Sequence, residues 1–141
     1  MQLIRVRDRL NEPRFIALLM PSMFQPTPKR AATKAAAYTQ DKGIDAYACR
    51  MNGLDVGLII LRMDGNSAEI LNISTDTAFR GLNVGRFMIE QTMVQCHLAT
   101  LDAETDDDAV GFYQRCGFTV ERSGDIDGRA RYRCRKTFDL S

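Results

Sequence analysis

The sequence has little of what many specialised binding sites need. It has no tryptophan and only one histidine, His97, among 141 residues. Its 19 basic and 18 acidic residues nearly cancel, so overall charge does not favour nucleic acid or an anionic membrane as a partner. No apolar run approaches the roughly 18 residues of a membrane-spanning helix, and the N-terminus is too charged for a signal peptide. We expect a cytoplasmic protein with neither nucleic-acid nor membrane partners.

Metal-ligand and disulfide patterns are also missing. The four cysteines are widely spaced, at Cys49, Cys96, Cys116 and Cys134, and no C-x-x-C pair occurs. This spacing disfavours a zinc site and a disulfide framework. His97 has no carboxylate motif beside it and is interpreted as an exposed or helix-end histidine. We therefore expect reduced, structural thiols and no metal.

Length and composition suit one compact domain, residues 1–141, because 45% of the residues are hydrophobic and 26% are charged. Hydrophobic periodicity and turn signals predict the element order β-α-α-β-β-β-α-β-α-β-β. The expected strands are 3–7, 44–51, 55–63, 68–75, 98–105, one from Phe118, and 129–138; the expected helices are 11–24, one from Pro28, 84–96, and one ending at Gly117. A helix between two strands around 84–97 implies at least one parallel pair in a mixed sheet.

Local signals place several boundaries. Thr27 before Pro28 is typical of a helix start, because a threonine hydroxyl caps free N–H groups and proline fits the first helical position. Asn52-Gly53 predicts a tight hairpin turn, since both residues accept a positive φ. Thr105 or Asp106 is expected to cap the last helix, with acidic residues in its first turn.

The segment "FRGLNVGRFMIE", 79–90, places Gly81 and Gly85 between an apparent strand and a helix. The first N–H groups of such a helix are unpaired and lie at its positive dipole end, which suits a phosphate. The two glycines would let the backbone turn sharply and approach a ligand closely, while Arg80 and Arg86 add positive charge. No G-x-x-x-x-G-K-[ST] or G-x-G-x-x-G motif occurs. From these residues alone, a plain structural turn and a phosphate site both stay open.

The same segment resembles the coenzyme A loop of the GNAT superfamily of N-acetyltransferases, with signature [Q/R]-x-x-G-x-[G/A]. Arg80 and Gly85 occupy its first and last positions. Asn83 stands where the family usually has glycine. Asparagine tolerates left-handed backbone angles better than other non-glycine residues, so we expect the loop to keep its shape.

A second segment, "DDDAVGFYQRCGF", is similar to the family's A-x-x-x-Y-x-x-x-G-F marker. The matching residues are Ala109, Tyr113, Gly117 and Phe118. The resemblance covers nearly the whole chain and is most secure from Ser67 to Thr119. It implies the α/β (α+β) GNAT fold, with a mixed, splayed, seven-stranded sheet flanked by about four helices.

The resemblance implies direct acetyl transfer from acetyl-CoA to a primary amine of a small molecule, protein or peptide. The implied coenzyme-binding residues are Ile73 and Thr75 on the strand beside pantetheine, Arg80, Gly81, Leu82, Asn83, Val84, Gly85 and Arg86 around the pyrophosphate, and Asp106, where many relatives carry asparagine. A backbone N–H near Thr75 is expected to polarise the thioester carbonyl. Because many relatives form dimers, a homodimer is left open.

Amine attack requires removal of a proton. A lysine-like amine with a pKa near 10.4 is only about one part in 2,500 neutral at pH 7. The resemblance implies Glu69 as the general base, acting directly or through water. The alternatives are an outward-facing strand glutamate or a water chain in its place. By strand alternation, Ala68, Ile70 and Asn72 are expected on the face opposite Glu69.

Tyr113 is the implied general acid. In many relatives the matching phenol contacts the coenzyme sulfur and protonates the departing thiolate. The alternative is a core aromatic residue packed beside Phe112 and Phe118. A covalent acyl-cysteine route through Cys116 is disfavoured, because no base partner is visible.

The last predicted strand carries four arginines at a period of two, namely Arg129, Arg131, Arg133 and Arg135. They are expected on one sheet face. One interpretation is recognition of an acidic or phosphorylated acceptor. The other is a solvated face balanced by acids such as Glu121, Asp125 and Asp127. A catalytically silent acyl-CoA sensor is the alternative function, although Tyr113 and Glu69 favour an enzyme.

Overall fold

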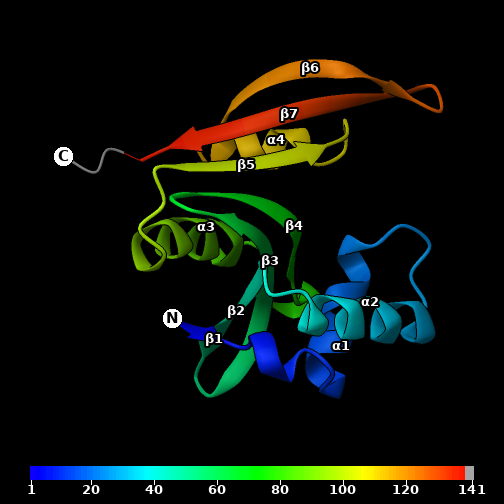
Figure 1. Ribbon diagram of the computed structural model, residues 1–141, viewed down its shortest axis with the longest axis vertical. Coiled ribbons are helices and arrows are strands. Elements are labelled where there is room, and N and C mark those ends of the chain that lie inside the picture. Colours follow the sequence, from blue (N-terminus) through cyan, green and yellow to red (C-terminus); the bar gives the residue numbers. More distant parts are fainter. Residues whose placement is uncertain (139–141) are drawn as a thin grey trace.

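The computed structural model describes residues 1–138, which contain one seven-stranded sheet and four α-helices (Figure 1). The strands are β1 (Gln2–Arg5), β2 (Ile44–Met51), β3 (Leu54–Asp64), β4 (Ser67–Thr75), β5 (Thr100–Thr105), β6 (Thr119–Ile126) and β7 (Arg129–Thr137). The helices are α1 (Pro13–Leu19), α2 (Pro28–Gln40), α3 (Val84–Gln95) and α4 (Val110–Arg115), with short 3-10 turns η1 (Arg7–Arg9), η2 (Met20–Ser22) and η3 (Thr77–Phe79). The spatial strand order is β1-β2-β3-β4-β5-β7-β6. The predicted fold class and element order are confirmed.

Several element ends differ from the predictions, and the first strand ends at Arg5 because η1 begins at Arg7. The first helix covers seven residues instead of 11–24 and gives way to η2, which contains Pro21. Proline has no N–H group to continue an α-helical ladder. The fifth strand begins at Thr100 because the chain first closes the end of α3, where Leu98 N–H donates to the Met93 carbonyl. His97 occupies that turn with φ 53° and is exposed, which confirms the helix-end interpretation.

Several turn predictions are confirmed in detail. The Thr27 side chain accepts a hydrogen bond from the Arg30 N–H at 3.1 Å and caps α2. Asn52 and Gly53 both have positive φ, 52° and 80°, as a tight hairpin between β2 and β3 requires. Gly117 ends α4 with φ 89°. No helix within residues 1–138 is long and apolar enough to cross a membrane.

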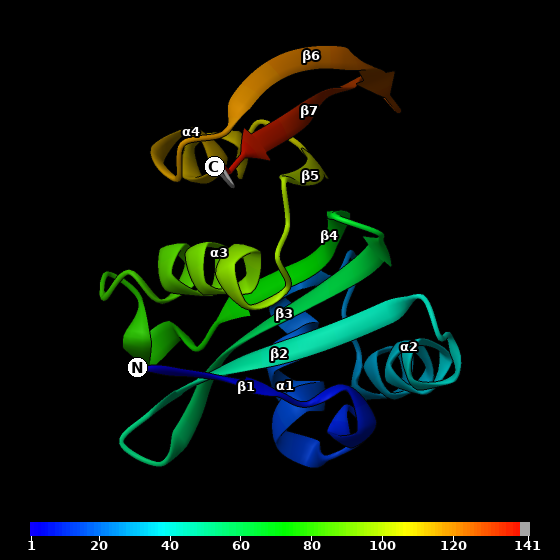
Figure 2. The ribbon, with the colours of Figure 1, turned by 60° about the vertical axis from the view of Figure 1, so that its left-hand side comes forward.

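The sheet is covered on both faces by separate helix pairs. One buried cluster joins α3 and α4 to the sheet and includes Met88, Tyr113 and Ile59. The other joins α1 and α2 to the opposite face and includes Ala35 and Ile60. Figure 2 shows α3 on one side of the central strands and α2 away from it. The α3–α4 pair and the α1–α2 pair therefore each cover one face of the sheet, and each face has its own buried core.

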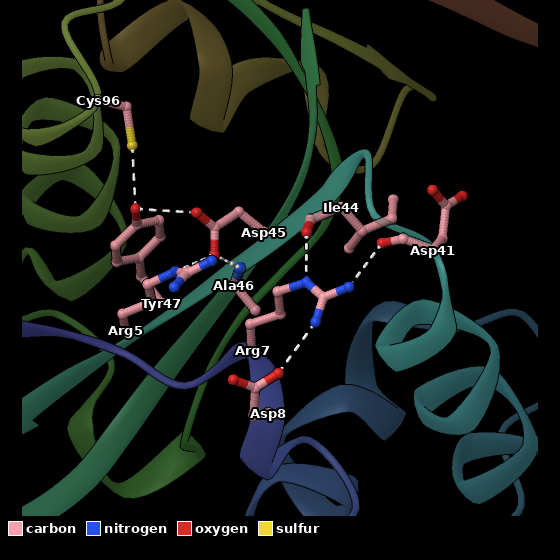
Figure 3. Close-up of polar contacts among 9 residues, drawn as sticks. All are labelled: Arg5, Arg7, Asp8, Asp41, Ile44, Asp45, Ala46, Tyr47 and Cys96. Atoms are coloured by element: carbon pink, nitrogen blue, oxygen red, sulfur yellow. Dashed lines mark hydrogen bonds and ion pairs between the residues drawn. The ribbon is translucent and has the colours of Figure 1, made fainter.

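A polar network holds β1 at the edge of the sheet (Figure 3). The Cys96 thiol donates to the Tyr47 hydroxyl at 3.3 Å, and that hydroxyl donates to Asp45 at 3.1 Å. Arg5 donates to the same carboxylate at 2.9 Å. Burial raises the pKa of the Cys96 thiol, so the thiol stays protonated near neutral pH. The network ties β1 to β2 and to the end of α3.

The sheet opens between β4 and β5. These strands are parallel and pair only over Ser67–Ile70 with Thr100–Ala103, which confirms the predicted parallel pair. Beyond Ile70, β4 continues beside β3 alone, and Figure 1 shows it bending away from β5. The predicted splay is therefore present, and it begins at this point.

A β-bulge in β4 lies at the start of the opening. Ile60 of β3 pairs with Asn72, but the next residue, Leu61, pairs with Ile70, so Leu71 is the extra residue. A bulge of this kind shifts the alternation of side chains by one position. The expectation that Asn72 lies opposite Glu69 is wrong, because the bulge brings Asn72 to the α1–α2 face, where Glu69 also lies.

Candidate active site

The open half of β4 has main-chain groups without a strand partner. Asp76 N–H donates to the Val56 carbonyl at 2.8 Å, which marks a hydrogen-bonded pair between β3 and β4. Hydrogen-bonded and non-hydrogen-bonded pairs alternate along antiparallel strands. The N–H and C=O groups of Thr75 and Ile73 therefore point away from β3 and toward the opening. An extended amide chain could pair with them there.

The chain leaves β4 through a fixed turn. The Asp76 carboxylate accepts from the Ala78 N–H at 2.9 Å and from the Arg14 guanidinium at 2.8 Å. The backbone N–H of Ala78, followed by Arg14, holds the pKa of Asp76 below its usual range. The carboxylate therefore stays ionised and anchors η3 at the entrance of the glycine loop.

The loop presents the N-terminus of α3. Gly81 has φ 83°, and Asn83 has φ 62° and ψ 28°, so Asn83 takes the expected left-handed shape. The first intrahelical bond runs from Phe87 N–H to the Asn83 carbonyl at 2.9 Å. No side chain caps the helix start. The N–H groups of Val84, Gly85 and Arg86 thus remain available at the positive end of a 12-residue helix.

Gly85 serves a different purpose from the one expected. It lies inside the first turn of α3, with no positive φ, so the expectation of a sharp turn there is wrong. A Cβ at this position would lie 2.8 Å from two ring carbons of Phe112. The missing side chain therefore allows α3 to pack directly on α4.

Arg86 is already engaged within the protein. Its guanidinium donates to the Arg115 carbonyl at the end of α4 and lies 3.8 Å from the Glu90 carboxylate. Arg86 remains half-exposed, so its positive charge at the rim of the loop stays a prediction. Arg80 is exposed and makes no ion pair with residues 1–138.

Tyr113 lies on α4 at the α3–α4 side of the opening. Its side chain is 5% exposed, and its ring makes edge-to-face contacts with Phe112 at 5.2 Å and Phe118 at 5.1 Å between centroids. Its hydroxyl forms no hydrogen bond with another residue of 1–138. Burial, with smaller contributions from Cys134 and Cys116, raises the pKa of Tyr113. The ring packs as a core aromatic would, while the hydroxyl stays protonated and free.

The acidic residues before α4 do not occupy its first turn, so that expectation is wrong. The helix begins only at Val110. Asp106 caps the preceding turn instead, where one carboxylate oxygen accepts from the Asp108 N–H at 3.1 Å and the Ala109 N–H at 3.2 Å. Asp106 thus fixes the chain between β5 and α4.

Glu69 lies on the last paired section of β4, just before the opening. It is exposed and stands in register between Arg62 and Asp102. Both neighbours have other partners, because Arg62 pairs with Asp41 at 3.2 Å and Asp102 binds Arg135 through two bonds of 2.7 and 2.8 Å. Within residues 1–138, the Glu69 carboxylate has no ion pair.

Comparison with known proteins agrees with this geometry. A family model for the acetyltransferase (GNAT) domain matches residues 42–120. The chain belongs to the GNAT superfamily. No sequence among the curated proteins matches it.

Solved structures share the GNAT fold at low sequence identity. The ribosomal-protein-S18-alanine N-acetyltransferase from Escherichia coli has a TM-score of 0.67 and 18% identity, covering 99% of this chain and 95% of that chain. A spermidine N-acetyltransferase variant from Vibrio cholerae has a TM-score of 0.66 and 16% identity, covering 97% and 95%. A protein assigned as a streptothricin acetyltransferase from Bacillus anthracis, solved with acetyl coenzyme A, has a TM-score of 0.60 and 22% identity, covering 74% and 68%.

The residues of this GNAT chain fit the acetyl-CoA that the family typically uses. Unpaired N–H groups at the start of α3 suit a pyrophosphate, and nothing lies within 4 Å of a Cβ built on Gly81. The free main-chain groups of Ile73 and Thr75 suit the amides of pantetheine. These features come from separate segments and meet at one opening.

Substitution of Asn83 tests the loop geometry. We expect Asn83→Gly to keep acetyl-CoA affinity within about threefold, because glycine adopts φ 62° freely. Asn83→Val should lower the free energy of unfolding by about 1–2 kcal/mol and weaken acetyl-CoA binding, since a branched side chain opposes left-handed angles. Chemical denaturation and calorimetric titration measure both effects. Equal stability of the valine and asparagine proteins would contradict the prediction.

The structure also brings together polar residues that the sequence analysis missed. The Tyr38 hydroxyl donates to the Asn72 amide oxygen at 2.6 Å, and the Asn72 NH₂ donates to Ser22 at 2.9 Å. Asn72 is 5% exposed. These bonds tie α2 and η2 to the open half of β4. The available signal was an asparagine within an apolar strand, since buried amides need partners.

Proposed function

We propose that this chain transfers an acetyl group from acetyl-CoA directly to a primary amine. The observation that carries the proposal is the opening between β4 and β5, which leads from the free main-chain groups of Ile73 and Thr75 to the uncapped start of α3. Tyr113 and Glu69 lie on opposite faces of the sheet at this opening. A donor and an amine could therefore meet from the two sides.

Coenzyme binding is assigned to main-chain groups. Ile73 and Thr75 would pair with pantetheine, and a backbone N–H near Thr75 would polarise the carbonyl. The loop residues Gly81, Leu82, Asn83, Val84 and Gly85 would surround the pyrophosphate, with Arg80 as the free cation and Arg86 holding α3 on α4. When bound, acetyl-CoA supplies the activated acetyl thioester. Asp106 is proposed to hold the chain beside pantetheine.

Tyr113 is proposed as the general acid. A free, protonated hydroxyl in a buried position can donate to the thiolate as it departs. Burial that raises the pKa of the phenol also raises the pKa of a thiol in the same surroundings. The pKa values of the Tyr113 phenol and the departing thiol therefore shift in the same direction, which keeps proton transfer between them possible.

Glu69 is proposed as the general base, and its substitution has a diagnostic pH dependence. We expect Glu69→Gln to lower kcat/KM at pH 7 by about 100-fold, because the amine is then almost wholly protonated. The defect should shrink toward pH 10, where the amine loses its proton unaided. Glu104→Gln is the matched control, because Glu104 is an exposed carboxylate on the neighbouring strand. A defect that is absent, or constant across pH, would favour a water chain.

The proposed partners are the coenzyme and an amine acceptor, with residues 1–141 acting as one domain. The four cysteines are free, which agrees with a reducing compartment such as the cytoplasm. The proposal leaves open whether the protein is a monomer or a homodimer. Gel filtration with light scattering would decide it.

The decisive test of the proposed function is thiol release from acetyl-CoA across a panel of primary amines. We expect turnover with at least one amine. Binding of acetyl-CoA without turnover of any amine would favour an acyl-CoA sensor. Failure to bind acetyl-CoA at all would refute both.

A further inference from the structure

The proposed coenzyme site leaves the opposite face of the sheet to the acceptor. On the α3–α4 face, Tyr113 and the uncapped start of α3 are assigned to the coenzyme. Figure 2 shows these two helices on one side of the β4–β5 opening, with α2 lying away from them. The face bordered by α2 is therefore the side from which an amine can approach. The bond from Tyr38 to Asn72 holds α2 beside the open half of β4.

Helix α2 is strongly cationic. It carries Lys29, Arg30 and Lys34 and no acidic residue over its 13 positions. None of the three forms an ion pair within residues 1–138, although Arg30 donates to the Gln25 carbonyl at 3.1 Å. Their charges are therefore uncompensated by the described protein.

These cations share one hollow with two hydroxyl groups. The hollow is shallow and open to solvent, and all its lining residues belong to α2 or its cap, namely Thr27, Lys29, Arg30, Thr33, Lys34 and Ala37. The Thr33 hydroxyl already donates to the Lys29 carbonyl at 2.9 Å, and the Thr27 hydroxyl caps the helix. The three cations are therefore the groups that can bind a phosphate or carboxylate here, and no carboxylate of the protein lines the hollow. The Lys34 ammonium also lies 5.8 Å from the centre of the Tyr38 ring.

Only some of the arginines of β7 add positive charge to the α1–α2 face of the sheet. Cys134 packs in the α3–α4 cluster, so alternation places Arg129, Arg131, Arg133 and Arg135 on the opposite, α1–α2 face. Arg135 pairs with Asp102, and Arg133 stands in register between Glu104 and Glu121, as the solvated-face interpretation expects. The acids Asp125 and Asp127 do not pair with these arginines, and Asp125 binds Arg122 instead.

Arg131 differs from these neighbours. Its Nε atom is buried and has no hydrogen-bond partner within residues 1–138, and the residue opposite it on β6 is Gly124. Arg129 also lacks an ion pair there. By contrast, the Glu69 carboxylate lies at the opening itself. The face thus combines a carboxylate at the reaction centre with unpaired cations at its margins.

We propose that the acceptor is an anionic amine, whose phosphate or carboxylate binds Lys29, Arg30 and Lys34 while its amine reaches Glu69. The inference rests on the proposed acetyl transfer. Lys34 and Arg30 precede Tyr38 by four and eight residues, or about 6 and 12 Å along the helix, and the Tyr38 hydroxyl binds Asn72 of β4. The anionic group of the acceptor would therefore lie one to two helical turns from the point at which α2 contacts the open half of β4. A polyamine is repelled by the same cations.

The test compares three amines of similar reach, namely aminohexyl phosphate, aminohexanol and spermidine. We expect kcat/KM for aminohexyl phosphate to exceed that for aminohexanol by about 10- to 100-fold, since charge-assisted hydrogen bonds contribute about 1.5–3 kcal/mol. Spermidine should be the poorest acceptor. Aminohexanoic acid separates carboxylate from phosphate recognition.

Charge reversal assigns the preference to α2. Arg30→Glu and Lys34→Glu should each remove most of the preference for phosphate, while KM for acetyl-CoA stays within about twofold because the helix lies across the sheet from α3. Lys42→Glu is the matched control, because it makes the same charge change at an exposed lysine beyond the end of α2. Thermal unfolding confirms that each variant is folded.

The possible outcomes separate the two proposals. Equal kcat/KM for aminohexyl phosphate and aminohexanol, or preference for spermidine, would overturn the inference while acetyl transfer stands. If no amine is turned over, calorimetric titration with aminohexyl phosphate still decides it. The anion site is supported if aminohexyl phosphate binds the original protein and the Lys42→Glu variant but not the Lys34→Glu variant. It is overturned if aminohexyl phosphate does not bind the original protein.

Discussion

Replacing Tyr113 with phenylalanine should lower kcat by about 100- to 1,000-fold while leaving the affinity for acetyl-CoA nearly unchanged. The phenyl ring keeps the edge-to-face contacts with Phe112 and Phe118. The lost hydroxyl has no hydrogen-bond partner within residues 1–138, so its removal strands no buried polar group. The free energy of unfolding should therefore change by less than about 1 kcal/mol.

The measurement combines thiol-release kinetics with chemical denaturation. Tyr132→Phe is the matched control, since its hydroxyl donates to Asp107 at 2.6 Å on the surface, and kcat should stay near that of the unmodified protein. Because burial raises the pKa of Tyr113 above its ordinary value near 10, the hydroxyl stays protonated up to that pH. The rate profile should then show no Tyr113-dependent decline between about pH 6 and 9. A kcat within threefold of the original would reduce Tyr113 to a packing residue.

Local signals accounted for much of the fold. The Thr27 cap, the Asn52-Gly53 hairpin and the end of α4 at Gly117 each depend on neighbours within a few residues. The single parallel pair followed from the position of one helix between two strands. The family resemblance then supplied the splay, which no local signal contains.

The arrangement of the acceptor side was not predictable in the same way. The two adjacent apolar residues Ile70 and Leu71 interrupt the alternation of β4, but the position of the bulge is set by the register with β3. This one extra residue moved Asn72 to the face that meets Tyr38 and Ser22, which lie 34 and 50 residues away in the sequence. Sequence periodicity predicts which residues alternate, but pairing decides where alternation slips.

The coenzyme loop shows the same limit at Gly85. A glycine in a phosphate-binding signature suggests close approach of a ligand, and the sequence offers no hint of a second explanation. The contact with Phe112 joins two helices whose residues are far apart along the chain. The motif thus singled out Gly85 as a position that needs glycine, but it did not show that packing against Phe112 is one of the reasons.

Gly85→Ala is therefore expected to destabilise the protein, against the usual helix preference. Alanine in a helix interior is favoured over glycine by about 0.5–1 kcal/mol. The added Cβ would lie 2.8 Å from Cε1 and Cζ of Phe112, closer than carbon atoms approach, and overpacking costs about 1–3 kcal/mol. The clash should prevail and lower the free energy of unfolding by about 1–2 kcal/mol.

The same substitution should weaken acetyl-CoA binding, because the shift acts at the first turn of α3, whose N–H groups are assigned to the pyrophosphate. Gly111→Ala is the matched control on α4, where the nearest atom is the tip of the flexible Arg115 side chain at 3.2 Å. We expect that control to keep full stability and coenzyme affinity. Phe112→Leu should make room for the methyl group, so the double variant Gly85→Ala/Phe112→Leu should lose less stability than the sum of the two single changes. Strict additivity would show that Phe112 is not what excludes a side chain at position 85.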